Sequence, residues 1–134
     1  MNIGLIADDA RKMLMQNLCI AYKGILGKHS LYSTGVTGRV IEEGTNLHVH
    51  NFLSGTLGGE QQISTMIEQN ELDMVIFLRD VTKVSNYENL FNKVIPLCDS
   101  YSIPLATNIA TAEMLIKGLS NGDLEWRSLY HSEE

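Results

Sequence analysis

The sequence predicts an α/β protein with a five-stranded parallel sheet, because short apolar segments alternate along the chain with longer segments of helical periodicity. The most apolar of the short segments, Leu72 to Leu78, has the composition of a strand that is buried on both faces. With 134 residues, of which 44% are hydrophobic, the chain is long enough to bury a core. We expect residues 1–134 to form one domain.

Five segments have the length and composition of strands, and each is followed by a turn or a helix start. The predicted strands are 3–7, 30–33, 47–52, 72–78 and 103–106. The predicted helices are 13–26, a short one that ends at 43, 60–68, 86–101, and one from Asn108 or Thr111 to about 119. Pro96 is expected to kink the helix that contains it or to end that helix early.

The composition excludes several classes of protein. The net charge of −6 argues against a nucleic-acid-binding protein, which normally carries a basic surplus. Two cysteines, Cys19 and Cys98, are too few for a disulfide framework and fit a reducing compartment. We see neither a signal peptide nor an apolar run of about 20 residues that could span a membrane. We therefore expect a cytoplasmic protein, and a small anionic ligand stays compatible with its charge.

The predicted sheet locates a ligand site. In open parallel sheets, ligands bind outside the carboxyl ends of the strands. The loops that follow the predicted strands there are 8–9, 34–38, 54–60, 79–86 and 107–111. Three of these loops are rich in glycine, small and hydroxyl residues, so we expect the site at this edge.

The loop from Thr34 to Gly38 lies between a predicted strand and a predicted helix. Such a loop can point several backbone N–H groups at one anion, and the hydroxyls of Thr34 and Thr37 add donors. A simple strand-to-helix turn with a cap would have the same composition. Taken alone, this loop leaves both interpretations open.

A second loop, from Ser54 to Gly59, has three glycines in six residues, which permits a close approach of the backbone to a ligand. Glu60 follows it, where a helix begins. Its carboxylate can be a surface group stabilised by the helix dipole, or a general base beside an anion site.

Three other features carry candidate chemistry. Lys12 falls in the first turn of the first helix, facing the carboxyl edge, where a cation opposes the helix dipole. Asp80 follows the most apolar strand and is either a site residue or a cap. His48 and His50 share one strand face, but a metal needs a third ligand and none is apparent, so we predict no metal site.

The order and spacing of several short stretches resemble one known family. They are Ile6-Ala7 with Asp9 and Lys12, Tyr32-x-Thr34-Gly35-x-Thr37-Gly38, Ser54-Gly55-x-Leu57-Gly58-Gly59-x-Gln61-Gln62, Val75 to Asp80, and Ile103 to Asn108 with Thr111-Ala112-Glu113. From Met1 to about Arg127, the chain resembles the methylglyoxal synthase family.

The resemblance implies a three-layer, flavodoxin-like α/β fold and a cytoplasmic homohexamer. It implies a carbon–oxygen lyase that converts dihydroxyacetone phosphate to methylglyoxal and phosphate, without metal or cofactor, and that phosphate inhibits. It also implies the residues that bracket the substrate phosphate, which are Lys12, Thr34, Gly35, Val36, Thr37, Ser54 and Gly55.

The catalytic half of the implied site departs from the family pattern. Asp8 stands where the family has histidine, Glu60 where it has an aspartate general base, and Tyr87 where a histidine polarises the substrate carbonyl. Leu90 replaces an aspartate, and Val36 replaces a threonine of the phosphate loop. By its position Asp8 is still a candidate phosphate-binding residue, although an acceptor-only carboxylate there disfavours a phosphate beside it unless it is protonated or turned away.

These residues leave three functions open. In a lyase, Glu60 would remove a proton from the carbon beside the carbonyl, while Tyr87, the Gly55 N–H and Asp9 or Asp80 would support the enediolate. A phosphate-ligand sensor or regulatory module would keep the pocket without the reaction. An enzyme for another small phosphorylated carbonyl compound is the third interpretation.

Overall fold

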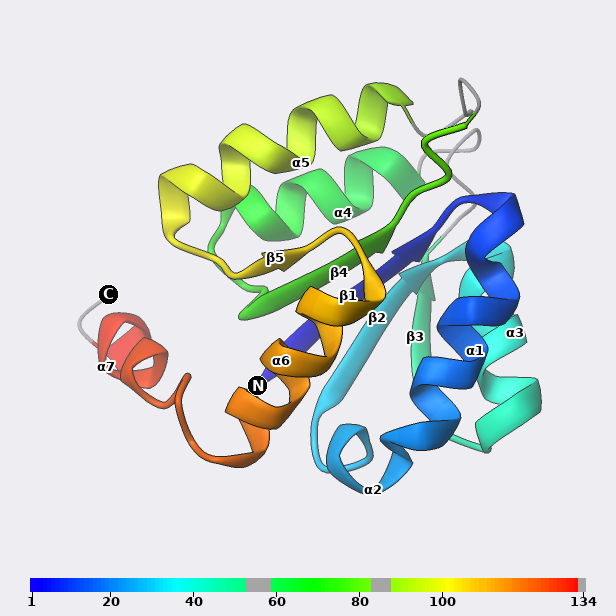
Figure 1. The fold of residues 1–134 in the computed structure, drawn as a ribbon. Helices are drawn as coiled ribbons and strands as arrows, with labels where there is room; N and C mark the ends of the chain where they lie inside the picture. Colours follow the sequence, from blue (N-terminus) through cyan, green and yellow to red (C-terminus); the bar gives the residue numbers. More distant parts are fainter. Residues whose placement is uncertain (53–58, 83–87, 133–134) are drawn as a thin grey trace.

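The computed structural model describes residues 1–52, 59–82 and 88–132, with the side chains of 60, 88 and 130–132 excepted. Figure 1 shows helices on both faces of one central sheet. The strands are β1 Asn2–Ala7, β2 Ser30–Thr34, β3 Val49–Phe52, β4 Met74–Leu78 and β5 Leu105–Ala106. The helices are η1 Asp9–Arg11, α1 Lys12–Ala21, α2 Lys23–Leu26, α3 Gly35–Thr45, α4 Gly59–Glu68, α5 Glu88–Tyr101, α6 Ile109–Ser120 and α7 Trp126–Ser132.

All five strands are parallel, in the order β3-β2-β1-β4-β5. This confirms the predicted five-stranded parallel α/β sheet. The order is that of the doubly wound nucleotide-binding sheets, whereas flavodoxin itself has the order 2-1-3-4-5. The chain runs outward from β1 through β2 to β3 and then returns to place β4 on the other side of β1. The topological switch point, where ligands of such sheets bind, therefore lies between β1 and β4.

Each central strand contributes to two apolar cores. Leu5 of β1 and Ile76 of β4 pack with residues of α1, α3 and α6, whereas Ile6 and Phe77 pack with residues of α4 and α5. Successive strand residues point to opposite faces, so a strand covered on both faces is apolar throughout. The burial of every residue in β4 explains why this segment reads as the clearest strand in the sequence.

Some boundaries differ from the sequence predictions. The predicted helix 13–26 is divided at Tyr22 into α1 and α2, and the third strand begins at Val49 rather than at residue 47. Pro96 lies inside α5, which continues to Tyr101, so an early end was wrong. Pro96 and Asn92, whose carbonyl loses the helical N–H partner, are both exposed, and water can satisfy that carbonyl.

The C-terminal segment is attached to the sheet through one buried arginine. The side chain of Arg127 is 2% exposed, and its Nε donates to Asp73 Oδ1 at 3.2 Å. Its terminal nitrogens donate to Asn70 Oδ1 and to the carbonyls of Leu72, Tyr101 and Ser102. The planar guanidinium group therefore binds two segments that are far apart in the sequence, 70–73 and 101–102.

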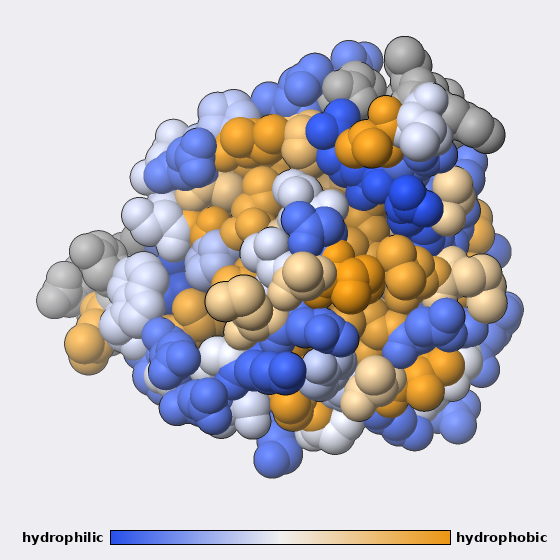
Figure 2. All heavy atoms as spheres, in the orientation of Figure 1, coloured by the Kyte–Doolittle hydropathy of each residue, from blue (hydrophilic) through white to orange (hydrophobic). Residues whose placement is uncertain are grey.

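Hydrophobic side chains also reach the surface. Figure 2 shows them, interrupted by polar groups, over the face that α1 and α6 form. Met13 on α1 is 61% exposed and Met114 on α6 is 74% exposed. Among the described residues, no helix is long and apolar enough to cross a membrane.

We expect both cysteine thiols to be unreactive in the folded protein. Burial raises the pKa of Cys19 and of Cys98 to about 12, so the thiolate, which is the reactive form, is scarce at neutral pH. A colorimetric disulfide reagent should label neither thiol within minutes at pH 7.5, and should label both once the chain is unfolded in guanidinium. Rapid labelling of a native thiol would contradict the burial described here.

Candidate active site

The structure brings the ends of β1 and β4 together at the predicted carboxyl edge. Asp8 follows β1, and its backbone N–H donates to Leu78 O of β4 at 3.0 Å. Asp8 Oδ2 accepts a hydrogen bond from Asp80 N at 2.8 Å. Asp8 is 3% exposed and Asp80 8% exposed, so the bond that joins them is buried. Two residues 72 positions apart thus meet at the topological switch point.

The Asp80 side chain forms hydrogen bonds within its own turn. Its Oδ1 accepts hydrogen bonds from Thr82 N, at 3.0 Å, and from the Thr82 hydroxyl. This geometry is the turn cap that the sequence offered as one of two interpretations of Asp80. Its backbone N–H, in turn, orients the Asp8 carboxyl group. Asp80 therefore links its own turn to the end of β1.

Lys12 is the first residue of α1 and reaches back to the end of β1. Its Nζ donates to Ala7 O at 3.3 Å and to Asp9 Oδ1 at 2.7 Å. The lysine side chain is 11% exposed, whereas that of Asp9 is 81% exposed. An ion pair with so exposed a partner contributes little to stability. The ion pair instead helps to hold the buried Lys12 ammonium group at the carboxyl edge of the sheet.

The loop from Thr34 to Thr37 joins β2 directly to α3. Thr34 occupies the N-cap position of α3, yet its side chain caps no N–H group in the described part of the chain. The hydroxyls of Thr34 and Thr37 are buried and have no hydrogen-bond partner among the described residues. Buried hydroxyls are normally paired, so these two are available to a ligand. Val36, between them, is half exposed.

Two glycines permit this loop geometry. Gly35 has a φ of 38°, in the left-handed region that glycine adopts without steric cost. At Gly38, a Cβ would lie 1.4 Å from Asn51 Oδ1. The backbone of α3 can therefore lie directly beneath the Asn51 side chain of β3. A larger residue at Gly35 would strain the N-terminal turn of α3, where the N–H groups point out of the helix, whereas one at Gly38 would displace the exposed Asn51 side chain.

Several predicted site residues lie outside the described part of the chain. Ser54, Gly55 and Tyr87 are among them. The backbone of Glu60 lies in the first turn of α4, but its side chain is not described. Leu90, where the family has an aspartate, is 1% exposed and packs in the core with Phe77. The leucine at this position is therefore a core residue.

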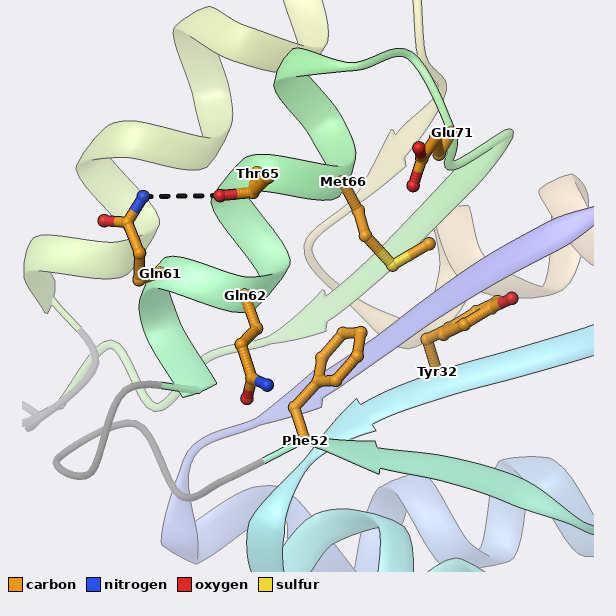
Figure 3. A pocket seen from close by; sticks show the side chains of 7 residues that line it. All are labelled: Tyr32, Phe52, Gln61, Gln62, Thr65, Met66 and Glu71. Atoms are coloured by element: carbon orange, nitrogen blue, oxygen red, sulfur yellow. Dashed lines mark hydrogen bonds between the residues drawn. The ribbon is translucent and has the colours of Figure 1, made fainter.

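A cavity of about 470 Å³ lies beside this edge rather than on it. It lies between the sheet and α4, and Figure 3 shows Gln62 and Met66 extending from α4 toward Phe52 and Tyr32. Its lining residues are Tyr32, Phe52, Gln61, Gln62, Thr65, Met66 and Glu71. None of the described residues predicted to bind phosphate lines this cavity. The periodicity of the sequence did not indicate this cavity, because β2, β3 and α4 form it only when packed.

The two histidines do not form a metal centre with other described residues. His48 and His50 are exposed, with ring centroids 4.8 Å apart, and His50 stacks on Tyr32 at 4.7 Å. In the described part of the chain, no three His, Cys, Asp or Glu residues are grouped to hold a metal ion. The pair extends a row of rings along the surface of the sheet.

The fold and the loops at its carboxyl edge place the chain in a recognised class of domain. The family model described as "MGS-like domain" matches residues 16–107. The chain is 58% identical over 129 residues to the methylglyoxal synthase of Caldicellulosiruptor saccharolyticus, covering 96% of this chain and 92% of that protein. It is 53% identical to the methylglyoxal synthase of Listeria welshimeri over the full length of both.

A solved structure gives the same result. The crystal structure of methylglyoxal synthase from Elizabethkingia anophelis matches with a TM-score of 0.77 and 34% identity, covering 86% of this chain and 76% of that one. The chain therefore belongs to the methylglyoxal synthase family.

Lys12 provides the first test of the candidate site. Replacing Lys12 by methionine should weaken the binding of inorganic phosphate by about 10- to 100-fold, because a hydrogen bond between charged groups contributes about 1.5–3 kcal/mol. Titration calorimetry measures this change. Lys93→Met is the control. It removes a lysine charge on the exposed face of α5, outside the predicted site, and should leave the phosphate affinity unchanged. Equal affinities in the wild type and Lys12→Met would exclude Lys12 from the anion site.

Proposed function

We propose that this protein is a methylglyoxal synthase that converts dihydroxyacetone phosphate to methylglyoxal and inorganic phosphate. The observation that carries the proposal is the pair of buried, unpaired hydroxyls of Thr34 and Thr37 at the edge where Lys12 holds its ammonium group. A tetrahedral anion with several acceptor oxygens satisfies hydroxyl, ammonium and helix N–H donors together. The family membership supports this ligand.

The reaction needs the removal of a proton from carbon, the cleavage of one C–O bond and the return of a proton to carbon. Glu60 removes a proton from the hydroxymethyl carbon beside the carbonyl, and the electron pair forms an enediolate. The enediolate then expels phosphate by cleavage of the C–O bond on the other side of the carbonyl carbon, while the hydroxyl group on the deprotonated carbon becomes the aldehyde and its proton passes to the departing phosphate. The enolate that remains gains a proton at its methylene carbon as it becomes methylglyoxal. Tyr87 and the Gly55 N–H stabilise the enediolate oxygen.

The phosphate-binding residues have a second role when the bond breaks. Lys12 and the donors of residues 34–37, with Ser54 and Gly55, bind the phosphoryl group and stabilise the charge that develops on it. Asp9 positions Lys12 through their ion pair. Asp80 positions Asp8 through its backbone N–H. In this proposal neither Asp9 nor Asp80 touches the reacting carbon atoms.

We further propose a cytoplasmic homo-oligomer, a hexamer by family resemblance, built from one domain over residues 1–134 and requiring no cofactor. The exposed methionines of α1 and α6 support association of copies, because large apolar side chains at a surface favour burial. Sedimentation measures the number of chains.

The decisive assay uses dihydroxyacetone phosphate as substrate. Purified protein should release methylglyoxal and phosphate well above the rate in buffer. Phosphate binding without release would instead identify the sensor or regulatory module, an alternative that the core position of Leu90 favours. Release from glyceraldehyde 3-phosphate alone would identify an enzyme for a different phosphorylated carbonyl compound.

A further inference from the structure

Asp8 is the one predicted phosphate-binding residue whose charge opposes the ligand. It precedes η1, but its side chain caps no N–H group of that helix in the described residues. The carboxyl group instead crosses to the β4 side of the switch point, where Oδ2 accepts the Asp80 N–H at 2.8 Å. The group is held inside the protein at 3% exposure rather than turned into solvent.

The second oxygen of this carboxyl group is unsatisfied. Asp8 Oδ1 is buried and has no hydrogen-bond partner among the described residues, as is true of the Thr34 and Thr37 hydroxyls. In the native state, a buried carboxylate oxygen is normally paired. Three such atoms at one edge of the sheet indicate a ligand that supplies partners for all three. A hydroxyl can donate or accept, whereas an ionised carboxylate only accepts, so the ligand must present a donor to Asp8.

Several charged groups around Asp8 make hydrogen bonds or ring contacts with other residues. Lys12 Nζ, from α1, binds Ala7 O and the exposed Asp9 carboxylate. Arg11 Nε donates to Arg79 O at 3.1 Å, and the Arg79 guanidinium lies 3.6 Å from the centroid of the Phe91 ring. Asp80, beyond β4, is hydrogen-bonded to Thr82. None of these contacts involves Asp8 Oδ1.

We propose that Asp8 is a specificity-determining residue that accepts the hydrogen bond of a protonated phosphoryl oxygen. The proposal rests on the phosphate site of the proposed function. A phosphomonoester, with a second pKa near 6, retains one proton on part of its population at neutral pH. Sulfate has the same shape but retains none. When a proton lies between Asp8 Oδ1 and a ligand oxygen, the two oxygens form a hydrogen bond. Without that proton, the carboxylate oxygen and the ligand oxygen are both acceptors and repel each other.

The test compares inorganic phosphate with sulfate by titration calorimetry between pH 6 and pH 9 at constant ionic strength. The wild type should bind phosphate on the order of 10²-fold more tightly than sulfate, because sulfate leaves a buried acceptor facing an acceptor. Above the second pKa of phosphate, affinity should fall about tenfold per pH unit, in step with the protonated species.

Asp8→Asn should abolish this selectivity. The asparagine oxygen can still accept the Asp80 N–H, while its NH₂ group donates to any ligand oxygen. Sulfate should bind Asp8→Asn to within about threefold of phosphate, and the steep loss of affinity with pH should disappear. Asp99→Asn, at the far end of α5 and exposed, removes the same charge and should behave as the wild type.

The outcomes separate this inference from the proposed function. Equal binding of phosphate and sulfate by the wild type would overturn the role of Asp8 even if the protein turns over dihydroxyacetone phosphate. Retained selectivity in Asp8→Asn would overturn it too. If the wild type binds neither anion, the phosphate site itself is wrong, and the proposed function fails with it. The wild-type comparison requires no variant, so it stands even if Asp8→Asn does not fold.

Discussion

Arg127→Met is expected to lower the free energy of unfolding by about 3–5 kcal/mol, because it removes the arginine of a buried ion pair and leaves the Asp73 carboxylate without this cation. Asp73 is 5% exposed, and its Oδ1 accepts the Arg127 Nε at 3.2 Å. The carbonyls of Leu72 and Ser102 would lose a donor as well. Since a domain of this size is typically stable by only about 5–15 kcal/mol, the loss is large.

Urea unfolding, followed at several protein concentrations, measures this change. Arg39→Met, an exposed arginine on α3, should change stability by less than about 0.5 kcal/mol. Adding Asp73→Asn to Arg127→Met should recover part of the loss, because it removes the buried negative charge that the arginine no longer neutralises. A change below 1 kcal/mol in Arg127→Met would show that the guanidinium is dispensable for the attachment of α7.

Glu60→Gln should lower kcat for dihydroxyacetone phosphate by on the order of 10³-fold, since a general base typically contributes 10²- to 10⁴-fold. The amide keeps the size of the side chain but cannot accept the proton. Phosphate affinity should stay within about twofold, because the role proposed for Glu60 lies in proton transfer rather than in phosphate binding. Initial rates of methylglyoxal formation and phosphate calorimetry together measure the two quantities.

Glu68→Gln is the matched control, because Glu68 is an exposed glutamate at the other end of the same helix, α4. It should retain full activity. Glu60→Asp keeps the carboxylate and should retain more activity than Glu60→Gln, with a penalty for the shorter reach. Full activity in Glu60→Gln would remove Glu60 from the role of base.

The sequence predicted what depends on local pattern. Segments such as 3–7 and 72–78 are apolar because they are buried on both faces, and such runs are visible without a structure. Pro96 misled the prediction because its cost depends on whether water reaches the freed carbonyl, which is a tertiary property. The contacts of Arg127 were invisible for a similar reason, because the acceptors come from 70–73 and 101–102, far along the chain.

The candidate site, too, could be predicted from the sequence only in part. Thr34, Thr37 and Lys12 could be placed at the carboxyl edge from spacing and topology, because strand ends and helix starts converge there. The orientation of Asp8 could not, since it depends on a hydrogen bond to Asp80 across the switch point. Spacing alone also could not show that Asp80 caps its own turn, which the Thr82 contacts show.

The most direct test of the proposed lyase reaction is the conversion of dihydroxyacetone phosphate in deuterium oxide, followed by magnetic resonance with a buffer-only control. If the protein forms the enediolate and expels phosphate, it should release methylglyoxal and phosphate in equal amounts. The methyl group of each product molecule should carry one deuteron from the solvent, acquired as the enol becomes the ketone. Phosphate release no faster than in buffer, or a methyl group without deuterium, would contradict the proposed reaction.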